Sequence, residues 1–142
     1  MLSPRPRLVL ADDHAGTRQL LRALLTPDFD IVADLADGVA LVKVTGQLTP
    51  DVVVTDIAMP GLDGIEATFL IHESQPDVRI VLVTVNGDPT LVACGFAAGA
   101  SGYVLKRMAG DDLVPAVHAV LDGERFVSRV IRDVPSSTIR SE

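Results

Sequence analysis

The chain has 142 residues, of which 48% are hydrophobic, and its formal net charge is −7. This length and composition fit one folded domain with a sizeable core and exclude global disorder. The acidic balance argues against a surface that grips nucleic acid through its phosphates. No apolar run approaches the roughly 18 residues of a membrane helix, the start is too short for a signal peptide, and the single cysteine excludes an internal disulfide. We therefore expect a cytoplasmic protein without membrane contact.

Five short apolar runs alternate with longer segments of helical character. The runs are rich in valine, isoleucine and leucine without alternation, which is typical of strands buried on both faces of a parallel sheet. Regular alternation of such strands with helices predicts a doubly wound α/β fold, with five parallel strands in a single domain. The expected strands are residues 7–11, 30–34, 52–56, 79–84 and 101–105.

Capping and stop signals delimit the first four helices. The first lies in "HAGTRQLLRALL", where four leucines recur at helical spacing before a proline, and the second is expected over 38–48. Asp63 and Glu66 have the spacing of a capping box at the start of the third. For the fourth, Asp88 is the expected N-cap, Pro89 the first helical residue and Gly99 the stop.

The last helix lies within "DDLVPAVHAVLDG" and contains Pro115. Proline has no N–H, so it is well tolerated only in the first turn of a helix. The sequence therefore predicts either a late start, with Asp112 as the N-cap, or a bend if the helix begins near Gly110.

Polar residues end or follow four of the predicted strands. Asp12 and Asp13 follow the first, Asp56 closes the third, Thr84 closes the fourth and Lys106 follows the fifth. The carboxyl ends of parallel strands form one ligand-binding edge. Three carboxylates gathered there would repel each other without a cation, and oxygen ligands favour Mg²⁺. One neutralised carboxylate can then attack phosphorus to form an aspartyl phosphate, whose oxygens a lysine and a hydroxyl would contact.

Each of these residues also has a purely structural interpretation. Asp12 or Asp13 could cap the first helix, and Asp56 could cap a turn. Thr84 could simply favour a strand, and Lys106 could be solvated. Their conjunction nevertheless favours a site. Elsewhere, the three histidines show no metal-ligand spacing, and the cysteine is interpreted as helix packing; these residues are His14, His72, His118 and Cys94.

Four segments resemble a bacterial response regulator receiver domain. They are "ADDH" at 11–14, "VVVTDIAMPGLDGIEAT" at 52–68, "VLVT" at 81–84 and "AAGASGYVLKR" at 97–107. The residues of these segments are most similar in type to the NarL/FixJ (LuxR-type) subfamily. The resemblance covers 7–127, so 128–142 is expected to be a C-terminal tail or the start of a linker.

The resemblance implies a flavodoxin-like fold with strand order 2-1-3-4-5. It also implies a site that is phosphorylated by a cognate histidine kinase. By the same resemblance, Asp56 is the phospho-acceptor, Thr84 and Lys106 contact the phosphoryl group, and Tyr103 reorients on activation. The implied Mg²⁺ ligands are Asp12, Asp13, Asp56 and the backbone carbonyl of Ala58.

Two other functions are compatible with part of this pattern. A haloacid-dehalogenase-like phosphatase also uses an aspartate after a parallel strand, but it needs a second acid two residues later, where this chain has Ala58. A pseudo-receiver would bind a partner without phosphorylation. We therefore expect a non-enzymatic signalling domain rather than a phosphatase.

The output is expected to lie in protein contacts, including a possible homodimer, or in a DNA-binding domain. The residues after 127 have too few apolar positions to build a helix-turn-helix core. DNA binding is therefore expected only through a C-terminal domain not present in this chain. The chain is either an excerpt of a transcription regulator, which is the favoured interpretation, or a stand-alone receiver.

Overall fold

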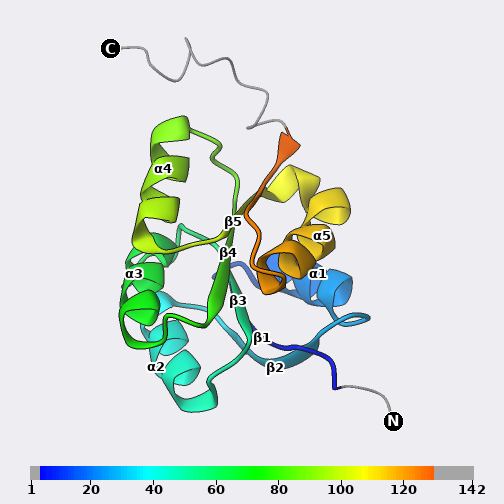
Figure 1. The fold of residues 1–142 in the computed structure, drawn as a ribbon, viewed down its shortest axis with the longest axis vertical. Helices are drawn as coiled ribbons and strands as arrows, with labels where there is room; N and C mark the ends of the chain where they lie inside the picture. The colour runs from blue at the N-terminus through cyan, green and yellow to red at the C-terminus, as the bar shows by residue number, and fades with distance from the viewer. Residues whose placement is uncertain (1–3, 130–142) are drawn as a thin grey trace.

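A computed structural model describes residues 4–129. In it, one parallel sheet is covered by helices on both faces (Figure 1), and its strand order is β2-β1-β3-β4-β5-β6. The strands are β1 (Arg7–Ala11), β2 (Asp30–Leu35), β3 (Val52–Thr55), β4 (Arg79–Thr84), β5 (Gly102–Leu105) and β6 (Phe126–Val127). The helices are α1 (Ala15–Leu25), α2 (Gly38–Leu48), α3 (Gly64–Ser74), α4 (Pro89–Ala98) and α5 (Ala109–Leu121), with a short 3₁₀ turn over Lys106–Met108.

The doubly wound parallel sheet and the order 2-1-3-4-5 are confirmed, but the predicted number of strands was wrong. The sixth strand, β6, pairs in parallel with β5, so that Gly102 faces Phe126 and Tyr103 faces Val127. Beyond it, the hydroxyl of Ser128 accepts a 3.1 Å hydrogen bond from the Leu105 N–H. Two residues are too short to show a periodicity, which explains why the sequence did not reveal this strand.

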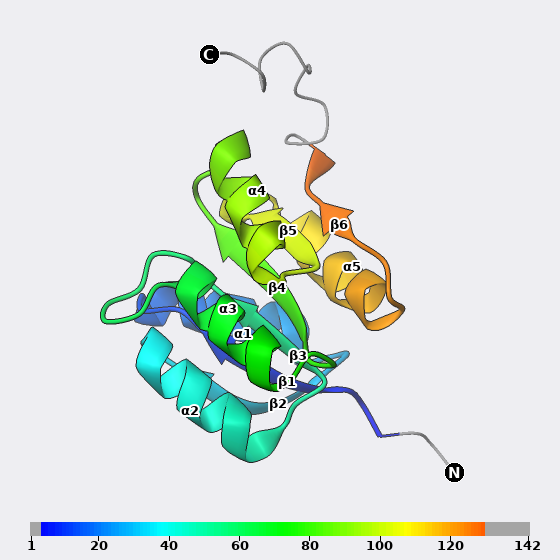
Figure 2. The same ribbon diagram turned by 60° about the vertical axis from the view of Figure 1, so that its left-hand side comes forward.

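Two buried cores lie on opposite faces of the sheet. Helices α2, α3 and α4 cover one face, and α1 and α5 cover the other (Figure 1). Figure 2 shows the molecule with α2, α3 and α4 turned forward. Alternate residues of the same strand serve different cores, as Val53 joins the first and Val54 the second. Every residue of β3 and β5 is buried. Continuous runs of apolar residues were the right signal for strands that are covered on both faces.

The predicted helix boundaries are largely confirmed. The capping box of α3 is complete, since the Asp63 carboxylate accepts from the Glu66 N–H at 2.8 Å and the Glu66 carboxylate accepts from the Asp63 N–H at 3.1 Å. In α4, Asp88 is the N-cap, Pro89 opens the helix, and Gly99 ends it with φ of 120°. Such a φ is in the left-handed region that glycine adopts without strain.

Periodicity was less informative about which helical residues are buried. Cys94 is exposed, so its interpretation as a packing residue was wrong. Nearly every side chain of α4 is apolar, so the sequence does not distinguish its buried face from its exposed face; the buried residues are Val92, Gly95 and Ala98. Leu20 of α1 is also exposed, at 60%. Within residues 4–129 no helix has the length and hydropathy to span a bilayer.

Helix α5 follows the second of the two predicted starts, near Gly110. It starts at Ala109, directly after the 3₁₀ turn, and Pro115 lies inside it, so the expected N-cap at Asp112 was wrong. The missing hydrogen bond falls on the carbonyl of Asp111, four residues earlier, and both residues are exposed, so water can satisfy it. The opposite face buries Leu113 and Val117 against the sheet. Burial of that face outweighs the local cost of the proline.

Replacing Pro115 with alanine is expected to raise the free energy of unfolding by about 1–2 kcal/mol. The substitution restores one helical hydrogen bond and removes the clash of the ring with the preceding turn, a gain partly offset by a more flexible unfolded chain. Urea denaturation followed by far-ultraviolet circular dichroism measures the change. A loss of stability would contradict the position of Pro115 on an exposed helix face.

Candidate functional site

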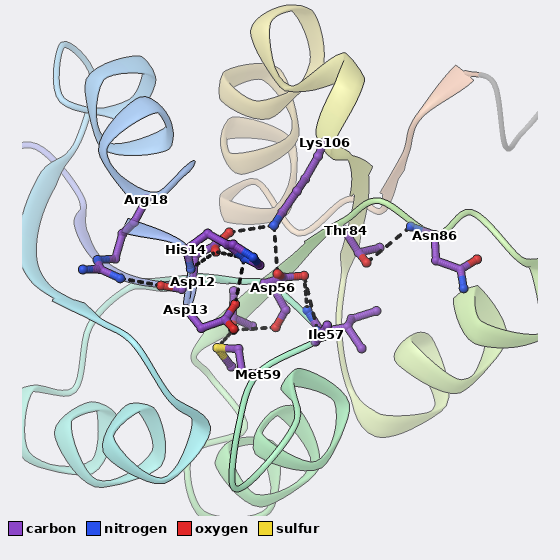
Figure 3. Close-up of polar contacts among 12 residues, drawn as sticks. Asp12, Asp13, His14, Arg18, Asp56, Ile57, Met59, Thr84, Asn86 and Lys106 are labelled. Carbon is purple, nitrogen blue, oxygen red and sulfur yellow. Dashed lines mark hydrogen bonds and ion pairs between the residues drawn. The ribbon is translucent and has the colours of Figure 1, made fainter. Parts of the chain in front are cut away.

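Asp12 is held rigidly where β1 ends. It is wholly buried, and its backbone N–H donates to the Leu35 carbonyl at 3.0 Å. Its Oδ1 accepts from the His14 N–H at 2.9 Å, and its own carbonyl accepts from the Arg18 guanidinium at 2.6 Å. The neighbouring Asp13 is exposed. The end of β1 therefore presents one fixed, buried carboxylate beside one accessible carboxylate (Figure 3).

Asp56 lies at the end of β3 and is only 3% exposed. One of its oxygens, Oδ1, accepts from the Ile57 N–H at 2.7 Å and lies 3.4 Å from the Ala58 N. These contacts are those of a turn-capping aspartate, so the structural interpretation of Asp56 is also correct. They occupy only one side of the carboxylate and leave Oδ2 turned toward the other acidic residues.

Lys106 joins the two buried carboxylates. Its Nζ lies 2.8 Å from Asp56 Oδ2 and 2.9 Å from Asp12 Oδ2 (Figure 3). Burial lowers the pKa of the Lys106 ammonium, but hydrogen bonds and Coulomb attraction from the two carboxylates outweigh burial, so the pKa is raised overall. The lysine is therefore fully charged at neutral pH.

One lysine does not balance the charge of this site. Carboxylate oxygens of Asp12, Asp13 and Asp56 come within 4.8 Å of one another, which with Lys106 leaves two negative charges uncompensated. Asp12 Oδ2 is buried and, apart from its ion pair with Lys106, has no hydrogen-bond partner among residues 4–129. Oxygen donors with an excess negative charge fit a divalent cation such as Mg²⁺. The three predicted carboxylates are thus brought together, and Ala58 places its own N–H 3.4 Å from Asp56 Oδ1.

Thr84 and Tyr103 both contact the backbone of Asn86. Thr84 is 2% exposed, and its hydroxyl oxygen lies 3.4 Å from the Asn86 N–H. Figure 3 shows it on the opposite side of Asp56 from Asp13. Tyr103 is fully buried, and its hydroxyl donates to the Asn86 carbonyl at 2.7 Å. Asn86 therefore connects the predicted switch residues through its backbone.

Tyr103 is expected to ionise at unusually high pH. Burial, reinforced by the negative charges of Asp88 and Asp56, raises its pKa from 10.0 to about 12. The chain has one tyrosine and no tryptophan, so ultraviolet absorbance reports this side chain alone. The unfolded chain loses the phenol proton first, so stability should fall as pH rises from 10 toward 12.

The measurement is a spectrophotometric titration of the folded protein beside a sample in concentrated urea. The unfolded sample should titrate near 10, the ordinary value for tyrosine. Coincident curves for the two samples would show that Tyr103 is accessible to water.

Sequence reasoning overlooked His14 and Arg18, and it missed the backbone contact of Asn86. His14 lies against the acids, although the histidines show no metal-ligand spacing among themselves. The sequence signal for His14 is its position directly after the aspartate pair. Arg18 holds the Asp12 carbonyl from one turn into α1. Asn86 acts through its backbone, which a sequence does not reveal.

Fold and site together define a class of protein: a doubly wound α/β domain with an acidic, lysine-linked site at the carboxyl ends of its strands. The family model described as the response regulator receiver domain matches residues 8–118, which is more than half of the chain. The chain therefore belongs to the response regulator receiver family. The subfamily expectation is also confirmed, because the relatives below are NarL- and LuxR-type regulators.

Two curated relatives illustrate the similarity. The transcriptional regulatory protein DegU of Brevibacillus brevis is 36% identical over 123 residues, which cover 85% of this chain and 52% of DegU. The nitrate/nitrite response regulator protein NarL of Escherichia coli K12 is 30% identical over 138 residues, which cover 94% of this chain and 63% of NarL. The chain thus spans between about half and two thirds of the length of these relatives.

Solved structures of response regulators share the fold of this chain. A LuxR-family two-component response regulator from Aurantimonas sp. SI85-9A1 superposes with a TM-score of 0.89 at 35% identity, covering 94% of this chain and 97% of that one. The signal receiver domain of a NarL response regulator from Mycobacterium tuberculosis has a TM-score of 0.82 at 27% identity, covering 86% and 100% of the two chains. The chain corresponds to the receiver portion of such regulators.

Proposed function

We propose that Asp56 accepts a phosphoryl group from the phosphohistidine of a cognate histidine kinase, or from a small donor such as acetyl phosphate. The observation that supports this most directly is the Asp56 carboxylate, which is fixed through Oδ1 and ion-paired with Lys106 through Oδ2. An oxygen of that carboxylate attacks phosphorus, the phosphorus–nitrogen bond of the donor breaks, and its electron pair returns to the imidazole. The product is an acyl phosphate on Asp56.

Positioning and charge neutralisation supply the catalysis. Asp12, Asp13, Asp56 and the Ala58 carbonyl would hold Mg²⁺, which when bound neutralises the charge of the acids and the incoming phosphoryl oxygens. Lys106 then neutralises a phosphoryl oxygen as a point charge, and Thr84 donates its hydroxyl to another. Both side chains already lie at the edge of the sheet that bears Asp56.

Switching would follow from the new acceptor oxygens. If Thr84 turns its hydroxyl toward the phosphoryl group, it gives up the contact with the Asn86 N–H. The loop that Asn86 shares with the Tyr103 hydroxyl would shift with it. We propose that this pair of side chains transmits phosphorylation to the surface between α4 and α5, and that this surface meets a partner or a second copy.

The chain has no proposed enzymatic activity of its own, since Ala58 stands where a phosphatase would need its second acid. We propose a cytoplasmic receiver over 7–127, with 128–142 as a tail or the start of a linker. Of this tail, only residues 128 and 129 are among the described residues. DNA binding is proposed only through a further C-terminal domain, an inference supported by a solved relative, RcsB, whose dimers are bound to DNA.

Intact-mass measurement after incubation with acetyl phosphate and Mg²⁺ tests this proposal. The expected result is the addition of one phosphoryl group to the wild type and none to Asp56→Asn. Excess EDTA should suppress the labelling of the wild type. Equal labelling of the two proteins would reject the assignment, and an unlabelled wild type would favour a phosphorylation-independent pseudo-receiver.

A further inference from the structure

His14 turns its imidazole toward the acidic site. Its Nδ1 lies 3.1 Å from Asp13 Oδ1 and 3.8 Å from Asp12 Oδ1 (Figure 3). The ring is 72% exposed, so it is open to solvent and to ions. The only nitrogen donor of the cluster thus stands at its mouth, while Asp12 and Asp56 form its buried floor.

The spacing of these donor atoms suits a single metal ion. One donor atom from each of His14, Asp12, Asp13 and Asp56 lies within 4.8 Å of the other three. Around an ion with bonds of about 2.1 Å, adjacent donors are about 3 Å apart and opposite donors about 4.2 Å apart. The 4.8 Å bound exceeds the distance between opposite donors by about 0.6 Å, so the exposed side chains of His14 and Asp13 would have to move by a distance of that order to share an ion with Asp12 and Asp56.

The charge of the site adds a second, independent requirement for a cation. Asp12 is fully buried, and its Oδ2 has no hydrogen-bond partner among the described residues beyond the ion pair with Lys106. A buried carboxylate with an incompletely compensated charge is costly. A divalent ion would satisfy it, and an imidazole beside it changes which ions are favoured.

We propose that His14 makes this a mixed nitrogen and oxygen site that binds late first-row divalent ions, of the class of Co²⁺, Ni²⁺ and Zn²⁺, in competition with Mg²⁺. Imidazole suits these ions, whereas Mg²⁺ prefers oxygen ligands and retained waters. The proposed ion site uses the same carboxylates as the proposed phosphorylation site. Only its effect on phosphorylation rests on the proposed function. The consequence is that such ions would compete with Mg²⁺ for the carboxylates around Asp56.

The alternative is that His14 only forms an exposed ion pair with Asp13. Exposed pairs of this kind contribute little to stability and do not select among metals. The two interpretations therefore differ in one measurable quantity, the ratio of Co²⁺ affinity to Mg²⁺ affinity, and in how far this ratio depends on His14.

The test is calorimetric titration of the 142-residue protein with Co²⁺ alone and with Mg²⁺ alone. His14→Gln should weaken Co²⁺ binding at least about tenfold and weaken Mg²⁺ binding much less. His72→Gln is the matched control, because His72 is exposed on α3 and lies outside the cluster; both affinities should stay at the wild-type values. With Zn²⁺ as a diamagnetic probe, the ¹⁵N imidazole resonance that disappears in His14→Gln should be the one that shifts.

Three outcomes would overturn the inference. Unchanged Co²⁺ affinity in His14→Gln would show that the imidazole is not a ligand. An equal loss of Co²⁺ and Mg²⁺ affinity would assign His14 a structural role. A Zn²⁺-induced shift confined to His72 or His118 would place the ion elsewhere. Phosphorylation of Asp56 by acetyl phosphate with Mg²⁺ is measured separately, so failure of the proposed function is distinguishable from failure of this inference.

Discussion

Replacing Lys106 with methionine is expected to lower the free energy of unfolding by about 3 kcal/mol in buffer that contains EDTA. The Nζ atom pairs with both Asp12 and Asp56, which are almost fully buried. Removing one partner of a buried ion pair leaves uncompensated charge in a low-dielectric environment, a cost of about 3–5 kcal/mol. Urea denaturation of the wild type and the variant measures the difference.

Two controls separate charge from packing. Adding Asp56→Asn to the Lys106→Met protein should recover much of the loss, because one of the unpaired carboxylates is then neutral. Saturating Mg²⁺ should also recover part of it, since an ion that binds only the folded state adds stability by mass action. A variant as stable as the wild type, or a loss that neither Asp56→Asn nor Mg²⁺ reduces, would contradict the charge balance described for the site.

Replacing Gly64 with alanine is expected to destabilise the protein by about 3 kcal/mol and to impair phosphorylation. Gly64 opens α3, and its N–H donates to the Ile57 carbonyl at 2.8 Å. A Cβ atom here would overlap the carbonyl oxygen of Asp56 and would lie 2.8 Å from the Cα of Ile57. Backbone cannot yield as a flexible side chain does, so the loop that bears Asp56 has to move.

The matched control is the same substitution at Gly110, near the start of α5, where a Cβ would meet nothing within 4 Å. Gly110→Ala should be stabilising by about 0.5–1 kcal/mol, because alanine is the better helix former. Chemical denaturation gives both values. Similar effects of the two substitutions would show that the close approach of Gly64 to Asp56 is not a constraint on the fold.

The sequence predicted the fold well where the signal was continuous or carried by a cap. Continuous apolar runs predicted five strands, and Asp63, Glu66 and Gly99 marked helix ends through local hydrogen bonding and backbone conformation. It failed where the outcome depended on tertiary burial. The sequence left two starts of α5 open and did not reveal the pairing of β6 with β5, because both depend on packing that no local pattern encodes.

The residues of the candidate site were likewise predicted only in part. Asp12, Asp13, Asp56 and Lys106 were found because the ends of parallel strands meet at one edge of a sheet, and the structure brings them together. His14 was missed because the spacing of the three histidines along the chain does not reveal it as a ligand. The acids beside it follow two different strands. The backbone of Asn86 was missed because main-chain contacts leave no residue-type signal.

The central claim is that Asp56, rather than another acid of the cluster, receives the phosphoryl group. Sodium borohydride reduces an acyl phosphate to the alcohol, so trapping followed by peptide mapping identifies the residue that was phosphorylated. After incubation with acetyl phosphate and Mg²⁺, we predict homoserine at position 56, with Asp12 and Asp13 unmodified. Reduction at Asp12 or Asp13, or no reduced residue in a protein that has gained the mass of a phosphoryl group, would contradict the account.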